Sequence, residues 1–535
     1  MIALLVACNP PDRGPRWKTA GAQTPRDGGT LRFASRDSIR TLDPTIAYDE
    51  ISFYPLQALF ATLVGYGQQG LELQPELAER WELVDGGTTY RFWLRPGIRY
   101  STGQPIVAAD FELALERALT TRDSPFGSML TDVIGASDVL AGTLRDCPGI
   151  VAVSDRELVI RLVRPAPAFL YVLALKFAAP QRADHLAAAG AQIRSRPLAS
   201  GPYELAMWDE GSRIVLRKNP RYWDPARGHL AQIEMLENIA SDTQFLMFER
   251  GELDAISKLT AADHLWITSQ SAWKPYVHQT TPMSTQGSRM SVGTKPFDDR
   301  RVRQALNYAV NKDNQIKLFN GRAVASHGLL PPGMAGRDEA LAPYPYDPAK
   351  ARALLAEAGY PDGFRTVYTS ITSPDVEMLA MSIQSDLAKV GVTVEIESMS
   401  LNTYGIAIGK PGGPAFGFNA WVGDFPDPTN FLDAKFHSRS IAPENSQNDA
   451  RYSSPELDAL LDAARTDLDP VSRAATYRRA EKLLYDDAPW IWGLHGLSIE
   501  VTQPYVRNYT PSPVWLCDFT YAWLDVGPDG DPVPQ

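Results

Sequence analysis

The chain of 535 residues is longer than one hydrophobic core usually supports, so we expect two or three folding units. Its formal net charge of −11 argues against a nucleic-acid-binding surface, because phosphate recognition needs concentrated Lys and Arg. Hydrophobic residues make up 44% and charged residues 21%, which is typical of a globular protein. No run of about 18 apolar residues occurs, so the sequence predicts no membrane-spanning helix.

The N-terminus contains a candidate lipidation site. Residues 5–8, Leu-Val-Ala-Cys, look like a bacterial lipobox, in which the cysteine is lipidated after cleavage just before it. Only seven residues precede Cys8 and none is basic, so the charged region of a signal peptide is missing. The alternatives are a start further upstream and a chance apolar N-terminus. Residues 1–27 are expected to be the remnant of this signal and a flexible tether.

Short strands are expected through the first half of the chain, where apolar and polar residues alternate between turn signals. Ser154 and Asp155 separate two of these strands and favour a hairpin turn. The expected strands are residues 29–34, 88–94, 151–153, 158–162, 214–217 and 232–236.

Helices and strands alternate after residue 345. Asp347 and Pro348 are a helix start, and Gly359 is a helix end. A strand at 366–371, a helix at 376–390 and a strand at 392–396 then predict a βαβ unit with a parallel pair. One more long helix is expected across 455–486. The sequence therefore predicts an α/β fold.

The segment 293–312 contains a further helix start. Asp298 is expected to be the N-cap, and Phe297 and Val302 are spaced for a hydrophobic staple. Val302 begins an apolar face, with Arg301 and Arg303 expected on the polar one. Periodicity alone supports nothing beyond an amphipathic helix.

The order of residues in 293–312 also resembles a signature of extracytoplasmic solute-binding proteins of family 5, the peptide, dipeptide and nickel receptors of ABC importers. Further similar motifs occur in the family's order, and Ala108 stands where the family usually has the Thr or Ser that caps a helix. The motifs are Thr41-Leu-Asp-Pro44 and the segments 94–111, 200–203, 218–223 and 250–254.

The resemblance implies a periplasmic-binding-protein-like fold of class II, with two lobes, an extra domain and three domains in all. The lobes are expected to close on a ligand by a hinge motion. The implied ranges are 28–50, 170–284 and 486–535 for domain I, 51–169 for the extra domain II, and 285–485 for domain III, the second lobe.

The segment 417–432 resembles the family's binding segment. The resemblance implies that Asp424 pairs with the N-terminal ammonium of a peptide, because a buried ammonium without an opposite charge costs several kcal/mol. The alternative is that Asp424 is only a turn residue in Asp-Phe-Pro-Asp-Pro. Asp427, before Pro428, is expected to be the structural one.

Main-chain pairing with an extended peptide is implied for two further segments. Ala420, Trp421 and Val422 match the family's edge segment, and Tyr48 to Glu50 match a loop on the facing lobe. Trp421 is also expected either to wall a side-chain pocket or to pack in the core.

Phe418 departs from the family pattern. Some peptide-binding members have an Arg at this position, which meets the carboxylate of the ligand. The guest is therefore either a longer peptide or another molecule, such as a nickel complex, an opine or an oligosaccharide.

A secreted hydrolase is the remaining alternative, but the sequence has none of the common linear motifs of metal, serine or phosphate chemistry. The seven His are scattered, so we predict no metal site and no cofactor. We expect a monomeric, non-catalytic receptor outside the cytoplasm. Its partners would be a small solute, an ABC permease and, through a lipid on Cys8, the membrane surface. Cys147 and Cys517 are either a disulfide or two free thiols.

Overall fold

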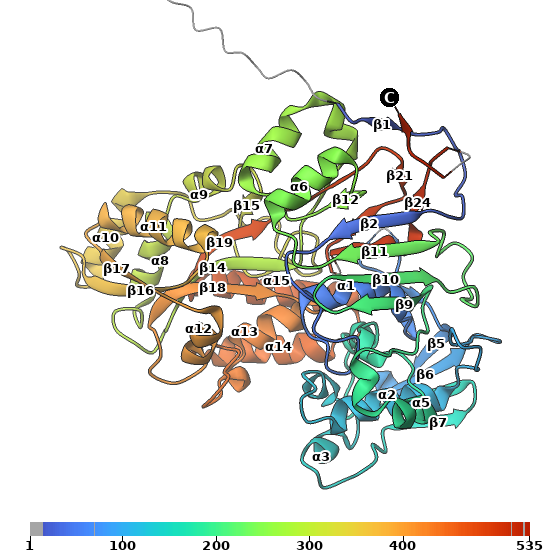
Figure 1. The fold of residues 1–535 in the computed structure, drawn as a ribbon. Coiled ribbons are helices and arrows are strands. Elements are labelled where there is room, and N and C mark those ends of the chain that lie inside the picture. Colours follow the sequence, from blue (N-terminus) through green and yellow to red (C-terminus); the bar gives the residue numbers. More distant parts are fainter. Residues whose placement is uncertain (1–13, 69, 515, 528–529, 535) are drawn as a thin grey trace, which may run out of the picture.

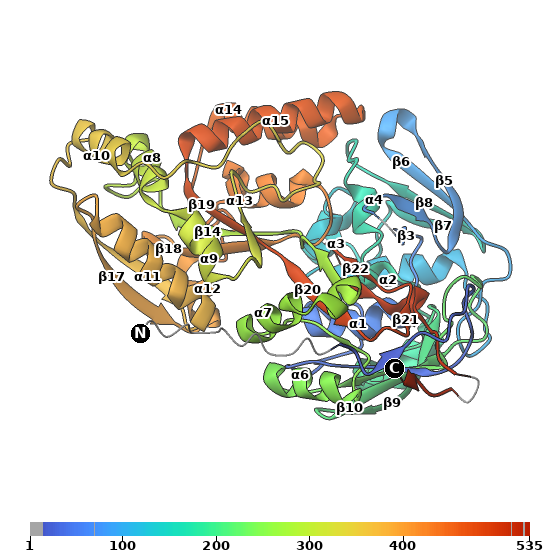
Figure 2. The same cartoon turned by 90° about the horizontal axis from the view of Figure 1, so that it is seen from above.

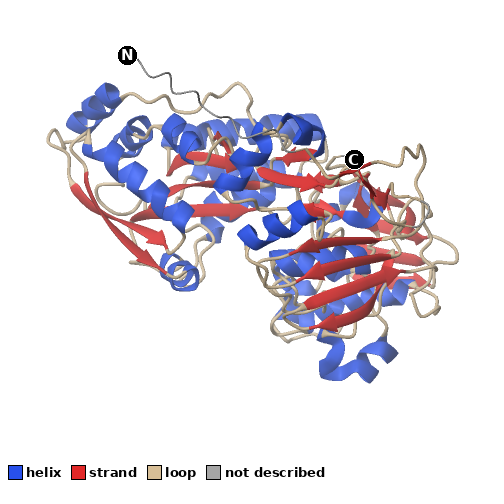
Figure 3. Cartoon of the chain, turned by 45° about the horizontal axis from the view of Figure 1, so that its top comes forward, coloured by secondary structure: helices blue, strands red, loops and turns tan. Residues whose placement is uncertain are grey.

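The computed structural model describes residues 14–68, 70–514, 516–527 and 530–534. Cys8 and its predicted lipidation lie outside these residues. Two lobes are visible in Figure 1, one holding the yellow and orange elements and one holding the blue, green and most red elements. Strands surrounded by helices occur in both (Figure 3), which confirms the predicted α/β class. No helix in the described residues is long and apolar enough to cross a membrane.

A four-stranded sheet forms the centre of the first lobe. β2 pairs in parallel with β11, and the other neighbours are antiparallel. Helix α1, Glu50–Leu59, packs against this sheet, with Leu31, Tyr203 and Ile233 in the shared core. The strand order is β2 (Thr30–Ala34), β11 (Gln232–Leu236), β10 (Arg213–Lys218) and β9 (Tyr203–Asp209).

The prediction of a flexible tether is wrong for residues 17–22. β1, Trp17–Lys18, pairs with β25, Val533–Pro534. The Trp17 ring packs against the core of the first lobe, and Asp525 accepts hydrogen bonds from the backbone N–H groups of residues 21 and 22. Aromatic burial and paired backbone groups therefore fix this segment, although its sequence shows no periodicity.

A flanking domain extends the first lobe. Its antiparallel sheet has the order β5 (Ala78–Val84), β6 (Thr89–Leu94), β8 (Glu157–Arg161) and β7 (Ile150–Ser154), with the hairpin predicted between the last two. Helix α2, Ala108–Thr120, covers the sheet around Phe92 and Phe111. Its N-cap, Val107, has no capping side chain, but Asp110 accepts a hydrogen bond from the Val107 backbone N–H at 3.1 Å. This bond replaces part of the missing cap.

A buried ion pair joins the flanking domain to the first lobe. Arg117 of α2 donates to both carboxylate oxygens of Asp43 at 2.7 and 2.6 Å, and also to Thr45 and Gln181. Asp43 belongs to the Thr41-Leu-Asp-Pro44 motif and is 2% exposed. The motif therefore holds two folding units together.

Six strands form the sheet of the second lobe. β16 and β17 are parallel and α11, Pro374–Ala388, connects them, which confirms the predicted βαβ unit. Helix α10, Pro348–Glu357, begins at the predicted cap, where Asp347 accepts from the Lys350 N–H at 2.9 Å. The strand order is β15 (Ala323–Ala325), β19 (Trp490–Gly496), β14 (Ser284–Met290), β18 (Phe416–Val422), β16 (Arg365–Ile371) and β17 (Thr393–Met399).

Three predictions about helices of the second lobe are wrong. Helix α8, Arg300–Ala309, is capped by Asp299 instead of Asp298, and Arg303 is buried because it donates to the backbone carbonyls of Phe297 and Asp487. The single helix expected across 455–486 is two, α14 (Pro455–Thr466) and α15 (Pro470–Asp487), which lie side by side in Figure 2. The second helix begins here because Asp469 is its N-cap and Pro470 suits the first helical position.

The chain crosses between the lobes at two adjacent places. β13 (Val277–Thr280) and β20 (Ser498–Thr502) pair in the first lobe with β12 (Ala255–Ile256) on the other side of β20. β13 is followed along the chain by β14, and β20 is preceded by β19. β14 and β19 pair with each other in the second lobe. Two short connections side by side are the geometry of a hinge.

Cys147 is a buried free thiol that donates to the Ile134 carbonyl at 3.4 Å, and burial raises its pKa. The side chain of Cys517 lies outside the described part of the chain.

The other α-helices are α3 (Ala136–Leu140), α4 (Phe169–Val172), α5 (Ala183–Ala189), α6 (Ser241–Arg250), α7 (Ala261–Ser269), α9 (Lys312–Leu318), α12 (Leu401–Ile408) and α13 (Ala434–Phe436). The other strands are β3 (Val64–Tyr66), β4 (Leu73–Pro75), β21 (Val506–Arg507), β22 (Thr510–Ser512), β23 (Leu516–Asp518) and β24 (Trp523–Leu524).

Removal of Arg117, whose side chain is partly buried, tests the joint between the flanking domain and the first lobe. Arg117→Ala leaves Asp43 buried without its counter-charge and is expected to lower the free energy of unfolding by about 3–5 kcal/mol. Urea unfolding followed by circular dichroism measures this loss. Arg91→Ala, which removes a solvent-exposed partner of Glu157, is the matched control and should shift the midpoint far less. Equal shifts would contradict the role given to Asp43.

A second prediction concerns Glu500 in the hinge strand β20. Burial raises its pKa to about 7 from a usual 4.5, and Tyr509 donates a hydrogen bond to it. The folded protein therefore binds this proton at a higher pH than the unfolded chain does. Its contribution to stability is present below pH 4.5 and is lost as the pH rises to 7. Between pH 4.5 and 7, the free energy of unfolding of Glu500→Gln should fall less steeply with rising pH than that of the wild type, by on the order of 1 kcal/mol per pH unit. Urea unfolding at several pH values measures this slope. Glu395→Gln, on the exposed face of β17, should leave the slope unchanged.

Candidate functional site

The loop after β18 reaches from the second lobe to the first. Phe425 is buried in the core of the flanking domain. Two residues later, Asp427 accepts from both terminal nitrogens of Arg473 at 2.7 and 2.8 Å, and from the N–H and hydroxyl of Thr429. An aromatic anchor and a bidentate ion pair thus fix the backbone on the C-terminal side of Asp424.

Asp424 lies at the contact between the lobes. Its Oδ1 accepts a hydrogen bond from the Tyr48 hydroxyl at 2.6 Å, and its Oδ2 accepts from Asn430 Nδ2 at 3.1 Å. Burial raises the pKa of Asp424, while the two hydrogen bonds act in the opposite direction. Burial, and then the Asp424 charge, raise the pKa of Tyr48, so the phenol keeps its proton and is the donor.

The strand edge next to Asp424 is open. β14 pairs with β18 along residues 416–422, but β16 pairs with β18 only at Gly417. Ala420 is exposed and the Val422 side chain is 68% exposed. Among the described strands, none pairs with the second edge of β18 beyond Gly417, although the Phe418 carbonyl accepts from the Tyr404 hydroxyl and the Ala420 N–H donates to the Asn419 side chain. An added strand would have to displace these side-chain contacts.

Trp421 packs against the core of the second lobe and also lines a cavity. Its ring is partly buried against the core of the second lobe and lines a cavity of about 320 Å³ with Tyr404 and Phe418. Lys435 Nζ lies 5.2 Å from the Trp421 ring centre and forms a buried ion pair with Asp449. The pocket thus has aromatic walls and a neutralised polar floor.

The segment from Tyr48 to Glu50 lies on the facing wall, but its three side chains have different contacts. Tyr48 reaches Asp424, whereas Asp49 caps α1 by accepting from the Ser52 N–H. Glu50 pairs with Lys258 at 2.7 Å, and both of these side chains are about half exposed. The segment is held by side-chain contacts on both sides.

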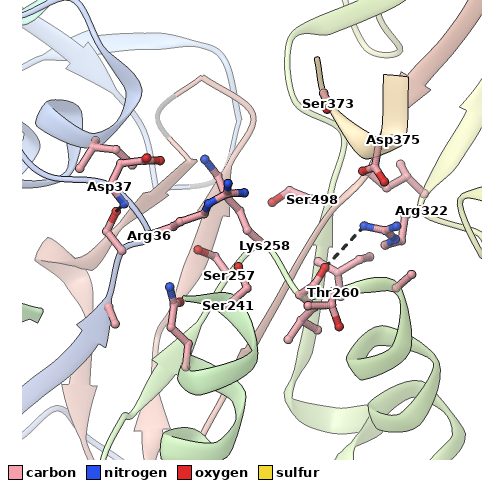
Figure 4. Close-up of a pocket in the computed structure, with 18 of the residues that line it drawn as sticks. Arg36, Asp37, Ser241, Ser257, Lys258, Thr260, Arg322, Ser373, Asp375 and Ser498 are labelled. Carbon is pink, nitrogen blue, oxygen red and sulfur yellow. Dashed lines mark hydrogen bonds between the residues drawn. The ribbon is translucent and has the colours of Figure 1, made fainter. Parts of the chain in front are cut away.

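A larger cavity of about 630 Å³ lies between the lobes beside β20. Figure 4 shows Arg36 and Lys258 on one side of it and Arg322, Ser373 and Asp375 on the other. The sequence predicts none of these residues as part of a site. They come from separate segments of both lobes, and no linear motif connects them. In the described part of the chain, no group of three or more His, Cys, Asp or Glu side chains is arranged to hold a metal ion.

The bond between Tyr48 and Asp424 gives a testable expectation. Tyr48→Phe removes one hydrogen bond between the lobes, about 1 kcal/mol, and should shift the ratio of open to closed protein about fivefold toward the open form. Small-angle X-ray scattering of the ligand-free protein measures this as a larger radius of gyration. Tyr360→Phe, within the second lobe, is the control. An unchanged radius would show that Tyr48 does not hold the lobes together.

The comparisons with known proteins agree with this architecture. The model of bacterial extracellular solute-binding proteins, family 5, matches residues 72–443. Heme-binding protein A of Haemophilus influenzae is 28% identical over 496 residues, 89% of this chain and 87% of the relative. Glutathione-binding protein GsiB of Shigella dysenteriae is 28% identical over 473 residues, 86% and 89% of the two chains.

A solved structure extends the match to three dimensions. The ABC transporter-associated periplasmic binding protein DppA from Helicobacter pylori, in complex with the peptide STSA, superposes with a TM-score of 0.77 and 25% identity. The superposition covers 94% of this chain and 99% of the DppA chain. The predicted two-lobe fold is therefore confirmed. The chain belongs to the bacterial extracellular solute-binding proteins of family 5.

Proposed function

We propose that this protein is the receptor of an ABC importer, which captures an extended oligopeptide between its lobes and delivers it to a membrane permease without catalysing a reaction. The observation that carries the proposal is the position of Asp424, a half-buried carboxylate at the contact between the lobes. The relatives are named for heme, glutathione and peptide ligands, so family membership leaves the guest open.

The surroundings of Asp424 suit an ammonium group. Each of its oxygens has one neutral donor, from Tyr48 and Asn430, so acceptor capacity remains for a charged donor. Burial already disfavours the isolated negative charge, and a cation would restore the balance. A peptide N-terminus supplies both the cation and three N–H donors.

The open edge of β18 complements this charge pair. A peptide with its N-terminus at Asp424 and its backbone beside residues 420–422 would pair with β18 by main-chain hydrogen bonds, which do not depend on the peptide sequence. The cavity walled by Trp421 would take one of its side chains.

A non-peptide guest, such as a nickel complex, an opine or an oligosaccharide, is the second candidate. Phe418 favours it, because this side chain lies in the apolar core of the second lobe and provides no charge for a ligand carboxylate. Native mass spectrometry of the protein purified from cells grown in rich medium distinguishes the two candidates. Co-purified peptides support the first candidate, and any other guest supports the second.

The remaining assignments follow from the receptor role. We propose a monomer outside the cytoplasm, tethered by a lipid on Cys8 if the N-terminal segment is a lipobox. The folding units would be residues 28–50, 170–284 and 486–535 for domain I, 51–169 for domain II and 285–485 for domain III. Separate hydrophobic cores in the first lobe, the flanking domain and the second lobe support a division into three units. Two bounds differ, because β19 (Trp490–Gly496) pairs in the second-lobe sheet and residues 172–178 pack in the core of the flanking domain.

Substitution of the carboxylate tests the ammonium contact. Asp424→Ala should raise the Kd for a co-purified peptide with a free N-terminus about 100-fold, because the ammonium is left buried without its partner. Binding of the N-acetylated peptide, which has no ammonium, should change little. Isothermal titration calorimetry measures both.

Asp424→Asn is the matched variant, because it keeps the size of the side chain and an acceptor for Tyr48. It should lose the same preference for a free N-terminus. Equal losses for free and acetylated peptide would show that Asp424 is only a turn residue. Bound peptide should also raise the Tm of the wild type, since it binds only the folded state.

A further inference from the structure

The corner between α14 and α15 brings the second lobe against the flanking domain. Figure 2 shows the two helices reaching the turn between β5 and β6. Arg465, in the last turn of α14, donates to both carboxylate oxygens of Asp132 at 3.2 and 3.1 Å. The Arg465 and Asp132 side chains are 21% and 15% exposed, so water screens this ion pair less than it screens a fully exposed one.

Asp132 is held in the flanking domain by its backbone and by a second arginine. Its carbonyl accepts a hydrogen bond from the Val163 N–H at 2.8 Å. Val133 and Leu162 form an antiparallel bridge beside it. Arg164 of the same domain pairs with the Asp132 carboxylate at 2.5 Å. The carboxylate is therefore fixed in place and binds one cation from each side of the contact.

The hydrogen bonds of the Arg465 side chain are made outside its own lobe. Among the described residues, Asp132 is the only acceptor that it reaches. Asp433, a carboxylate of the second lobe, interacts electrostatically with Arg465 but accepts its hydrogen bond from Arg439 at 2.6 Å. Arg465 therefore exchanges these bonds for water when the second lobe moves away from the flanking domain.

An apolar contact lies next to this ion pair. Leu468, in the turn between α14 and α15, lies over Gly87, in the turn between β5 and β6. Gly87 has a φ of 90°, and a Cβ at this position would overlap the Leu468 side chain. Glycine thus permits both the left-handed backbone and the close approach.

The same corner is tied to the loop of Asp424. Arg473, near the start of α15, donates from Nε to the Ala464 carbonyl at 3.0 Å, one residue before Arg465. The two terminal nitrogens of Arg473 hold Asp427, three residues after Asp424. One arginine therefore links the end of α14, the start of α15 and the loop of the candidate site, so that the corner and Asp424 move together.

We propose that Arg465 and Leu468 of the second lobe, with Asp132 and Gly87 of the flanking domain, form a latch that stabilises the closed arrangement without a contact to the guest. The flanking domain then helps to set the ratio of closed to open protein and the rate at which a guest is released. Because half of the latch is a partly exposed ion pair, salt weakens it. The inference goes beyond the proposed function and does not depend on what the guest is.

Two matched arginine variants test the ionic half of the latch in the ligand-free full chain. Both remove one cation from Asp132, but Arg465→Gln breaks a bond to the second lobe, whereas Arg164→Gln breaks one within the flanking domain. Arg465→Gln should shift the ratio of closed to open protein about fivefold toward the open form, measured by small-angle X-ray scattering as a larger radius of gyration. Arg164→Gln should leave the radius unchanged. Equal radii for Arg465→Gln and the wild type, or equal increases in both variants, would overturn the latch.

A second pair of variants tests the apolar half and does not depend on the folding of Arg465→Gln. Leu468 and Val471 are 44% and 75% exposed at the same corner, and Leu468 is the one that lies over Gly87. Leu468→Ser should shift the ratio about threefold toward the open form. Val471→Ser should leave it unchanged, and circular dichroism confirms that both variants are folded. The same radius in Leu468→Ser and Val471→Ser would contradict the latch.

Salt and guest release separate the latch from the proposed function. When NaCl is raised from about 0.05 M to about 0.5 M, the wild-type radius should increase, and that of Arg465→Gln should increase less. A radius that responds to salt equally in both proteins would overturn the ionic latch. The co-purified guest, followed after dilution as the bound fraction in native mass spectrometry, should dissociate about fivefold faster from Arg465→Gln. A guest that is not a peptide would contradict the proposed function and leave these results on the latch intact.

Discussion

The carboxylate of Asp424 can serve as a site only because its backbone is held from both lobes. Phe425 is inserted into the core of the flanking domain, and Asp427 is locked by Arg473. A half-buried charge on a loose loop would turn toward water, where its hydration is better. Anchored in this way, Asp424 stays between the lobes, with Tyr48 as the first-lobe group that satisfies it.

The same constraint connects the site to the hinge. Tyr48 precedes α1, whose first turn carries Glu50 and Ile51, so one short segment touches Asp424, Lys258 and the cavity beside β20, which is the hinge-side cavity. The walls of that cavity belong to different lobes, and β20 lies behind them. A guest in that cavity would contact both lobes, and its binding free energy would favour the closed arrangement.

Much of the fold could be predicted from local sequence, but less of the site. Asp347, Pro348 and the apolar period of α11 set helix ends and a βαβ unit through local chemistry alone. Periodicity does not predict the break at Asp469, because apolar residues recur on both sides of it. Burial of Arg303 depends on carbonyls distant in sequence, one of them Asp487. Asp424 and Tyr48 were found by family resemblance, whereas Arg36, Lys258 and Arg322 come from separate segments that only the fold brings together.

The hinge-side cavity is lined by three cationic side chains, although the whole chain has a formal net charge of −11. At physiological ionic strength, exposed charges are screened beyond about 8 Å, so the overall negative charge opposes an anionic guest only weakly at close range. Inside a cleft bounded by protein, cations and helix N-termini act with less screening. Asp424 lies at the contact between the lobes, whereas Arg36, Lys258 and Arg322 line the hinge-side cavity, so the first place favours a cation and the second an anion.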